Sequence, residues 1–402
     1  ENITDEQVQS QITVMNQDYR KLTGTPGYNT NAVGADTQVE FVLAKVDPNG
    51  NPTNGINRVN LCQASWSTAA INSTVKPTTI WDPMQYMNMW SINFTDTSLL
   101  GYAQFPESSL GGMATTAQNP NTDGVVANYT TFGSSDLASG SFAPPYDKGR
   151  TMTHEVGHFL GLRHIWGDNS TCPATNTAND KDFVADTPAA NAANFGCPTG
   201  TNTCTGNPGN DMIENYMDYT DDTCMSVFTT GQKARITTVL NNSPRRSTLK
   251  TSIKDVAIPL FANDAEVKIE NLCSTSSATC TDTNPASPAK SVLLYNRGTS
   301  TLTAATLNYN FNGSTNATHN WVGSLAPNKY VKIVLPNSTS NGLLTVTVVT
   351  ANGVADQRAS NNVATKTFGS VLSYANATTF TFTLIGDSYG TETTWSLKNQ
   401  AG

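Results

Sequence analysis

Apolar residues spaced three or four positions apart predict an amphipathic helix at the start of the chain, over residues 4–22. Thr4 and Gln7 have the spacing of a capping box at its first turn, and Gly24 is expected to end it. The apolar face of this helix comprises Val8, Ile12, Met15, Tyr19 and Leu22. One side of the helix is therefore expected to lie against a core.

Strand and helix patterns alternate over the next 220 residues. Strand-like alternation occurs over 38–46, 99–105 and 125–132. A helix is predicted from about 147 to 160, followed by a long polar loop over 165–228. A second capping-box pair, Thr229 and Gln232, opens a helix that reaches about residue 241. These elements predict an α+β domain over residues 1–250.

The pattern changes after a polar segment at 242–256, which we interpret as a linker. Short alternating segments separated by Asn, Gly and Pro are typical of an all-β sandwich, here over 256–370. These segments are 265–270, 290–295, 303–311, 329–335 and 343–349. Residues 371–402 contain a further alternating run at 379–385, which we interpret as the truncated start of another β module.

Composition and charge narrow the classes of protein that remain. Hydrophobic residues make up 37% of the 402 residues and the net charge is −8, which argues against a disordered chain and against a nucleic-acid partner. No apolar run approaches the ~18 residues of a membrane span. Because the chain begins at Glu1 without an apolar leader, we expect a mature secreted, extracellular protein.

Seven cysteines favour an oxidising compartment. Cys273 and Cys280 lie close together in a Ser/Thr-rich loop and are expected to form a small disulfide, whereas Cys62 is expected to be a buried free thiol. Four more cysteines gather in the loop that follows the histidine cluster: Cys172, Cys197, Cys204 and Cys224. A second zinc site is the alternative for these four, although CxxC pairs are absent.

The strongest chemical signal is the segment HEVGHFLGLRH at 154–164, which holds three of the chain's four histidines. On a helix, His154 and His158 face the same side and can bind one metal ion. Gly161 can adopt a positive φ, so the chain can turn there and bring His164 to the same ion. Three protein ligands leave a fourth position for water, the arrangement of a catalytic zinc site. A surface helix with ordinary histidines is the alternative.

This arrangement predicts a hydrolytic mechanism. Zinc lowers the pKa of bound water to about 7. The Glu155 carboxylate, next to the first ligand, would take the proton as water attacks a peptide carbonyl and return it to the leaving amine. We therefore expect a zinc-dependent endopeptidase whose partners are protein or peptide substrates.

The histidine segment resembles the long zinc signature of the metzincin proteases. Further similarity to the pappalysin family of metzincins lies in NYMDYTDDTCMSVFTTGQ at 215–232, and in the segments at 99–106, 123–133, 149–158 and 182–188. The resemblance implies a metzincin-like α+β catalytic domain with a twisted sheet, an active-site helix and a loop-rich C-terminal subdomain. The β domain shows a weaker similarity to bacterial adhesion-type sandwiches.

The resemblance also implies roles for single residues. Met217 would be the Met-turn residue beneath the zinc site, and the Tyr219 hydroxyl would stabilise the tetrahedral intermediate. Asp222 would line the S1′ pocket and favour Arg or Lys at P1′, since a carboxylate pairs well with a guanidinium. The implied disulfides are Cys172–Cys204 and Cys197–Cys224.

Two further features are implied by the same resemblance. The strand at 125–132 would form the upper rim of the cleft, where an extended substrate adds as an antiparallel strand. Asp180, Asp182 and Asp186 would hold a structural calcium ion, which prefers oxygen ligands. Solvated acidic side chains are the alternative for this group.

Two other functions remain as alternatives. A binding or adhesion protein could keep the protease fold as a silent scaffold, but it would be expected to lose Glu155 or a ligand. A zinc hydrolase could instead act on a non-peptide amide. Metal content separates the scaffold from an enzyme, and a chelator-sensitive digest of protein identifies a peptidase.

Overall fold

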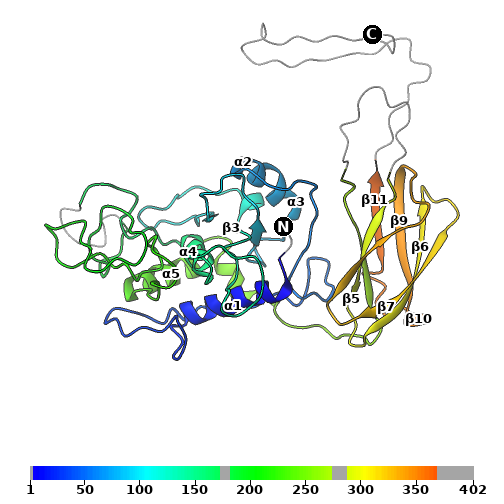
Figure 1. The fold of residues 1–402 in the computed structure, drawn as a ribbon, viewed down its shortest axis with the longest axis horizontal. Coiled ribbons are helices and arrows are strands. Elements are labelled where there is room, and N and C mark those ends of the chain that lie inside the picture. Colours follow the sequence, from blue (N-terminus) through cyan, green and yellow to red (C-terminus); the bar gives the residue numbers. More distant parts are fainter. Residues whose placement is uncertain (1–2, 173–181, 274–287, 369–402) are drawn as a thin grey trace, which may run out of the picture. The chain divides into compact units, whose positions relative to one another are not determined.

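The computed structural model describes residues 3–172, 182–273 and 288–368. The chain divides into two compact units, residues 1–259 and 260–402, and each is described by itself (Figure 1). The predicted module at 371–402 lies outside the described residues. Within the described residues, no helix is both long and apolar enough to cross a membrane.

The first helix of the first unit is α1 (Asp5–Tyr19). The Thr4 side chain accepts a hydrogen bond from the Gln7 backbone N–H, as predicted for the helix start. The helix ends earlier than predicted, because Lys21 already adopts a left-handed φ of 45° and Leu22 is exposed. The apolar face therefore covers fewer residues than the sequence pattern indicates.

A three-stranded sheet in the order β1-β3-β2 forms the centre of the first unit. Strand β3 (Val125–Asn128) pairs in parallel with β1 (Met89–Ile92) and antiparallel with β2 (Gly101–Ala103). The prediction that 125–132 forms the rim of the cleft is wrong, because both edges of β3 are occupied. The edge strand is β2.

Residues 38–46 do not form the predicted strand. Their extended backbone bonds to side chains and loops instead of to another strand. The Asn16 side chain accepts from the Phe41 N–H at 2.7 Å and donates to the Phe41 carbonyl at 2.9 Å. The Lys45 N–H donates to the Lys254 carbonyl at 2.7 Å. The alternation of apolar residues thus indicated a segment that is not paired with a strand in the described part of the chain.

Helices cover both faces of the sheet. On one face lie α2 (Thr68–Ala70), a π-helical turn (Ile71–Val75) and α3 (Lys76–Thr79), none of them predicted from the sequence. The other face packs against α4 (Arg150–Phe159), whose ten residues are all buried. A 3-10 turn (Pro120–Thr122) leads into β3.

The last α-helix of this unit, α5 (Thr230–Asn242), begins with the predicted capping box of Thr229 and Gln232. The predicted linker at 242–256 is wrong in its first half. Arg245 and Arg246 are buried inside the first unit, and a 3-10 helix (Ser247–Thr251) follows them. From the sequence, two adjacent arginines are expected to be solvated, but both guanidiniums here pair with the buried side chain of Asp123.

The cysteines correct one prediction. Cys172–Cys204 and Cys197–Cys224 are disulfides, as the family resemblance implied, which leaves no cysteine in this loop for a second zinc site. Cys62 is exposed and disulfide-bonded, so the prediction of a buried free thiol is wrong. Its apolar neighbours in sequence lie in an open loop rather than in a strand. The predicted Cys273–Cys280 pair lies partly outside the described residues.

The described residues of the second unit form two antiparallel sheets, which confirms the all-β prediction. One sheet has the order β4-β5-β8; the other has β10-β9-β6-β7, with β11 paired to β9. Their buried side chains form one cluster between the sheets, as in a sandwich. The strands are β4 (Ala265–Ile269), β5 (Ser291–Asn296), β6 (Leu302–Phe311), β7 (Ala317–Leu325), β8 (Tyr330–Val334), β9 (Gly342–Ala351), β10 (Val354–Ala355) and β11 (Val363–Phe368).

Candidate active site

Helix α4 brings three imidazoles together. His154 and His158 lie one turn apart, and Gly161 turns the chain with a φ of +89°. Candidate ligand atoms of His154, His158 and His164 all lie within 4.8 Å of one another. Among the described residues, this is the one group of three or more His, Cys, Asp or Glu side chains close enough to share a metal ion.

Each imidazole is oriented through its Nδ1 atom. His154 Nδ1 lies 2.6 Å from the Tyr216 carbonyl, and His158 Nδ1 lies 2.8 Å from the Leu162 carbonyl. His164 Nδ1 lies 2.5 Å from Asp168 Oδ1. These contacts fix the rings so that their Nε2 atoms converge, with His158 and His164 Nε2 3.1 Å apart. Such partners also favour the tautomer that ligates a metal.

The electrostatics of the site suit a divalent cation. Burial, and to a smaller extent the nearby His164, lowers the pKa of His154 to about 3. Burial and the neighbouring imidazoles also lower the pKa of His158 well below its usual range. Neutral imidazoles are the form that binds metal, and three nitrogen ligands fit zinc. The residues present therefore fit a catalytic zinc ion.

Glu155 follows the first histidine on α4, and its side chain lies against the edge strand β2. Its side chain is so close to β2 that a Cβ added to Gly101 would lie 2.9 Å from Glu155 Cγ. Burial raises the pKa of the Glu155 carboxyl to about 8. A cation bound to the histidines would oppose this shift, because a nearby positive charge favours the carboxylate. The group can therefore exchange a proton near neutral pH.

Met217 packs against the active-site helix, and Tyr219 lies beside the histidine rings. Met217 is fully buried, and a Cβ added to Gly157 of α4 would collide with its sulfur. The Tyr219 ring lies 4.9 Å from His164 and 5.6 Å from His154, and 39% of the residue remains exposed. Burial, followed by Glu155, raises the pKa of Tyr219 to about 12. Its hydroxyl is therefore a donor at neutral pH.

The Asp222 side chain is buried beside the N-terminus of α4. Its Oδ2 accepts hydrogen bonds from the backbone N–H groups of Lys148 at 2.7 Å and Arg150 at 3.2 Å. Burial raises the pKa of the Asp222 carboxyl to about 6, against these hydrogen bonds. The carboxylate thus satisfies donors at the N-terminus of the active-site helix through one oxygen only.

The predicted calcium ligands Asp182 and Asp186 both have protein partners. Asp182 accepts from the Val184 N–H and the Thr187 hydroxyl, and burial raises its pKa to about 7. Asp186 accepts from the Thr229 hydroxyl and the Gly231 N–H at the start of α5. Asp180 lies outside the described residues.

Two residues of the site were missed in the sequence. Asp168 orients His164 and also pairs with Arg163 at 2.9 Å. The Trp166 ring stacks on His164 with centroids 4.3 Å apart. An acidic residue four positions after the third histidine was a usable signal, since ligating imidazoles commonly donate to a carboxylate.

Comparison with known proteins supports this reading of the site. Residues 70–241 match the profile of the family described as pregnancy-associated plasma protein-A. An extracellular metalloprotease from Arthroderma benhamiae is 32% identical over 235 residues, covering 58% of this chain and 70% of that protein. A relative of the same description from Pyricularia oryzae is 30% identical over 237 residues, covering 59% and 68%.

A solved structure aligns with a larger share of the chain. Mature mirolysin from Tannerella forsythia, in complex with a cleaved peptide, is 39% identical, with a TM-score of 0.54. The alignment covers 64% of this chain and 93% of mirolysin.

Proposed function

The chain belongs to the pappalysin family of zinc metalloendopeptidases, and from this premise we propose that Glu155 is its general base. The observation that carries the proposal is the convergence of three oriented imidazoles beside one buried carboxylate. The disulfides of the first unit and the extracellular relatives support a secreted enzyme. Exchange of Glu155, described in the Discussion, tests the role.

In this proposal His154, His158 and His164 hold zinc, which would supply a polarised water and a Lewis acid for the peptide carbonyl. Glu155 accepts the proton of the attacking water and passes it to the leaving amine. The Tyr219 hydroxyl donates a hydrogen bond to the carbonyl oxygen as negative charge develops on it. Met217 supports the helix from below and takes no part in proton transfer.

The substrate would bind to the edge of β2 rather than to β3. Among the residues that the structure describes, β3 is the one strand paired with β2, so the other edge of β2 can accept an extended peptide. Gly101 on this strand lies against Glu155. A peptide added there would therefore pass the proposed base.

Replacing Tyr219 by Phe should lower kcat roughly 10- to 100-fold while changing KM less than threefold, because the hydrogen bond strengthens at the transition state. Steady-state kinetics on a quenched fluorescent peptide measure both constants. Phe195, whose ring also contacts Tyr219, offers a control: Phe195→Leu should leave kcat nearly unchanged. A change in KM alone would remove this role from Tyr219.

Asp222 is proposed to favour Arg or Lys at P1′ through Oδ1, because Oδ2 accepts both backbone hydrogen bonds. Asn in its place keeps an oxygen for these N–H groups but removes the charge. Asp222→Asn should therefore reduce the preference for Arg over a neutral P1′ residue roughly 10- to 100-fold. Paired peptides that differ only at P1′ measure the ratio of kcat/KM.

The pH dependence of this preference has a defined sign. Protonation of a carboxyl with a pKa near 6 removes its charge, so the preference should be present above pH 6 and fade below it. Asp221→Asn, at the partly exposed neighbour, should leave the ratio unchanged. An Asp222→Asn enzyme with the same ratio as wild type would exclude Asp222 as the determinant.

A structural calcium ion near Asp180, Asp182 and Asp186 stays a prediction. Asp182 and Asp186 would have to exchange their present hydrogen bonds for the ion. Elemental analysis of purified protein tests it, and one calcium per chain is the expected result.

A further inference from the structure

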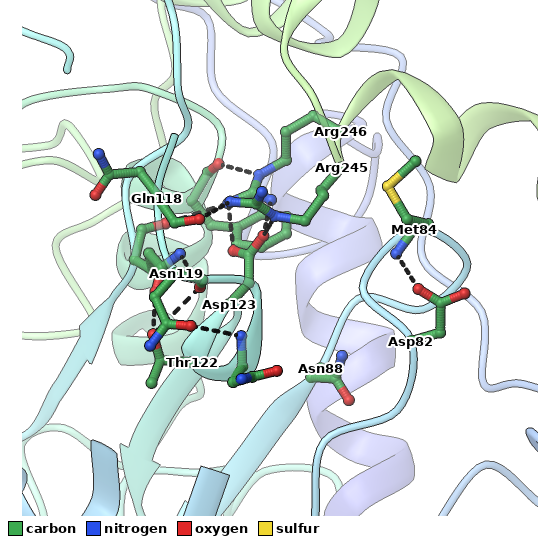
Figure 2. Close-up of polar contacts among 12 residues, drawn as sticks. Asp82, Met84, Asn88, Gln118, Asn119, Thr122, Asp123, Arg245 and Arg246 are labelled. Atoms are coloured by element: carbon green, nitrogen blue, oxygen red, sulfur yellow. Dashed lines mark hydrogen bonds and ion pairs between the residues drawn. The ribbon is translucent and has the colours of Figure 1, made fainter. Parts of the chain in front are cut away.

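A buried cluster of one carboxylate and two guanidiniums lies between the end of α5 and the start of β3 (Figure 2). Arg245 Nε lies 2.6 Å from Asp123 Oδ2. Arg246 Nη1 and Nη2 donate to the two oxygens of Asp123 at 2.9 and 2.8 Å. The Asp123 side chain is fully buried and that of Arg246 is 1% exposed. The pairing is therefore shielded from solvent.

Arg246 has three further contacts, and each involves an element of the proposed active site. Its Nε donates to the carbonyl of Phe159, the last residue of α4, at 2.8 Å. Its Nη2 donates to the carbonyl of Gln104, the residue after β2, at 3.3 Å. Its guanidinium carbon lies 3.3 Å from the centroid of the Phe159 ring. One side chain thus bonds to the end of the active-site helix and to the end of the edge strand.

Arg245 shares the carboxylate but has a different second partner. Its Nη2 donates to the carbonyl of Gln118 at 3.1 Å, in the loop before β3 (Figure 2). Among the described residues, neither of these two hydrogen-bond partners of Arg245 lies in α4 or β2. Comparing the two arginines therefore separates the effect of pairing with Asp123 from the effect of contact with the ends of α4 and β2.

The contacts of Arg246 join the two elements, α4 and β2, whose relative position matters for peptide hydrolysis. Helix α4 carries His154, Glu155 and His158, and β2 offers the edge to which a peptide would add. Peptide main-chain bonds to β2 place the scissile carbonyl, so a small shift of β2 against α4 misplaces it. The planar fork of Arg bonds to both carbonyls and to Asp123 at once, whereas the single ammonium of Lys does not match this geometry.

We propose that Arg246 is a positioning residue that fixes β2 against α4, and thereby the docking of an extended peptide at the zinc site. The inference rests on the proposed function, because it takes β2 as the substrate-binding edge. A residue with a merely structural role would lower stability without changing how well the folded protein binds peptide. Peptide affinity in folded protein therefore distinguishes the two roles.

The test uses zinc-loaded full-length protein carrying Glu155→Ala, which keeps the metal ligands and does not consume the peptide. Arg246→Lys and Arg245→Lys are each added to this background. Titration calorimetry measures the Kd of an octapeptide that spans the cleft and the Kd of acetohydroxamate, a small zinc chelator. Both are measured at a temperature at which circular dichroism shows each variant folded.

We expect Arg246→Lys to weaken octapeptide binding about tenfold and to leave acetohydroxamate within twofold. Arg245→Lys should leave both within twofold. An unchanged octapeptide Kd in folded Arg246→Lys overturns the proposal, as does an equal loss in Arg245→Lys. If Arg246→Lys does not fold, Arg246→Gln, which is uncharged and keeps donors, replaces it under the same criteria. Failure of wild-type protein to cleave peptides would instead contradict the proposed function.

Discussion

Replacing Glu155 by Gln should lower kcat on peptide substrates by on the order of 10³- to 10⁴-fold, the upper range for loss of a positioned general base. Gln nearly matches Glu in shape, so the buried space beside Gly101 stays filled. The amide cannot accept the proton of the attacking water. Zinc should remain bound, because Glu155 lies outside the group of three imidazoles.

Zinc content separates this result from a trivial loss of the metal. One zinc per chain in both wild type and Glu155→Gln, measured by plasma mass spectrometry, is the expected control result. His164→Ala should instead reduce both zinc content and activity. A Glu155→Gln enzyme that retains more than a tenth of wild-type kcat would remove Glu155 as the base.

Replacing Asp123 by Asn should destabilise the first unit by about 3–5 kcal/mol, because it leaves the Arg245 and Arg246 charges buried without their counter-charge. Urea unfolding followed by tryptophan fluorescence measures the change. Asp136 provides a matched control, since its side chain is 56% exposed and pairs with Lys148 at the surface. Asp136→Asn should cost less than about 1 kcal/mol.

Equal midpoints for Asp123→Asn and wild type would contradict the account of this cluster. Such a result would mean that water reaches the two guanidiniums when Asp123 is neutral. The expected loss also has a consequence for activity. Measured at a temperature where the variant is folded, its kinetics show whether the pairing with Asp123 is needed to keep Arg246 in place.

The zinc site could be predicted from the sequence because its chemistry is local. His154, Glu155 and His158 lie within five positions of one helix, so helical periodicity alone places the two imidazoles on one face, with Glu155 next to the first of them. Gly161 supplied the turn to His164 through its backbone freedom. The capping boxes at Thr4 and Thr229 were equally local. The box at Thr229 forms completely, whereas at Thr4 the side chain accepts the hydrogen bond from the Gln7 backbone N–H.

Features that depend on distant partners could not be predicted in this way. Residues 38–46 alternate like a strand, but no strand in the described part of the chain pairs with them to form a ladder. The edge position of β2 follows from the pairing order of three separate segments, which alternation does not encode. Arg245 and Arg246 looked like linker residues, because their partner Asp123 lies more than a hundred positions earlier.

The most direct test of the central claim is mass-spectrometric mapping of every bond cut in a denatured protein mixture. Wild-type enzyme, enzyme stripped of metal with 1,10-phenanthroline, stripped enzyme with zinc restored, and Glu155→Gln are compared. The account predicts internal peptide-bond cleavage by wild type, its loss on stripping, its return with zinc, and its near absence in Glu155→Gln. Cleavage that survives in both the stripped enzyme and Glu155→Gln, or no cleavage by zinc-loaded wild type, would contradict it.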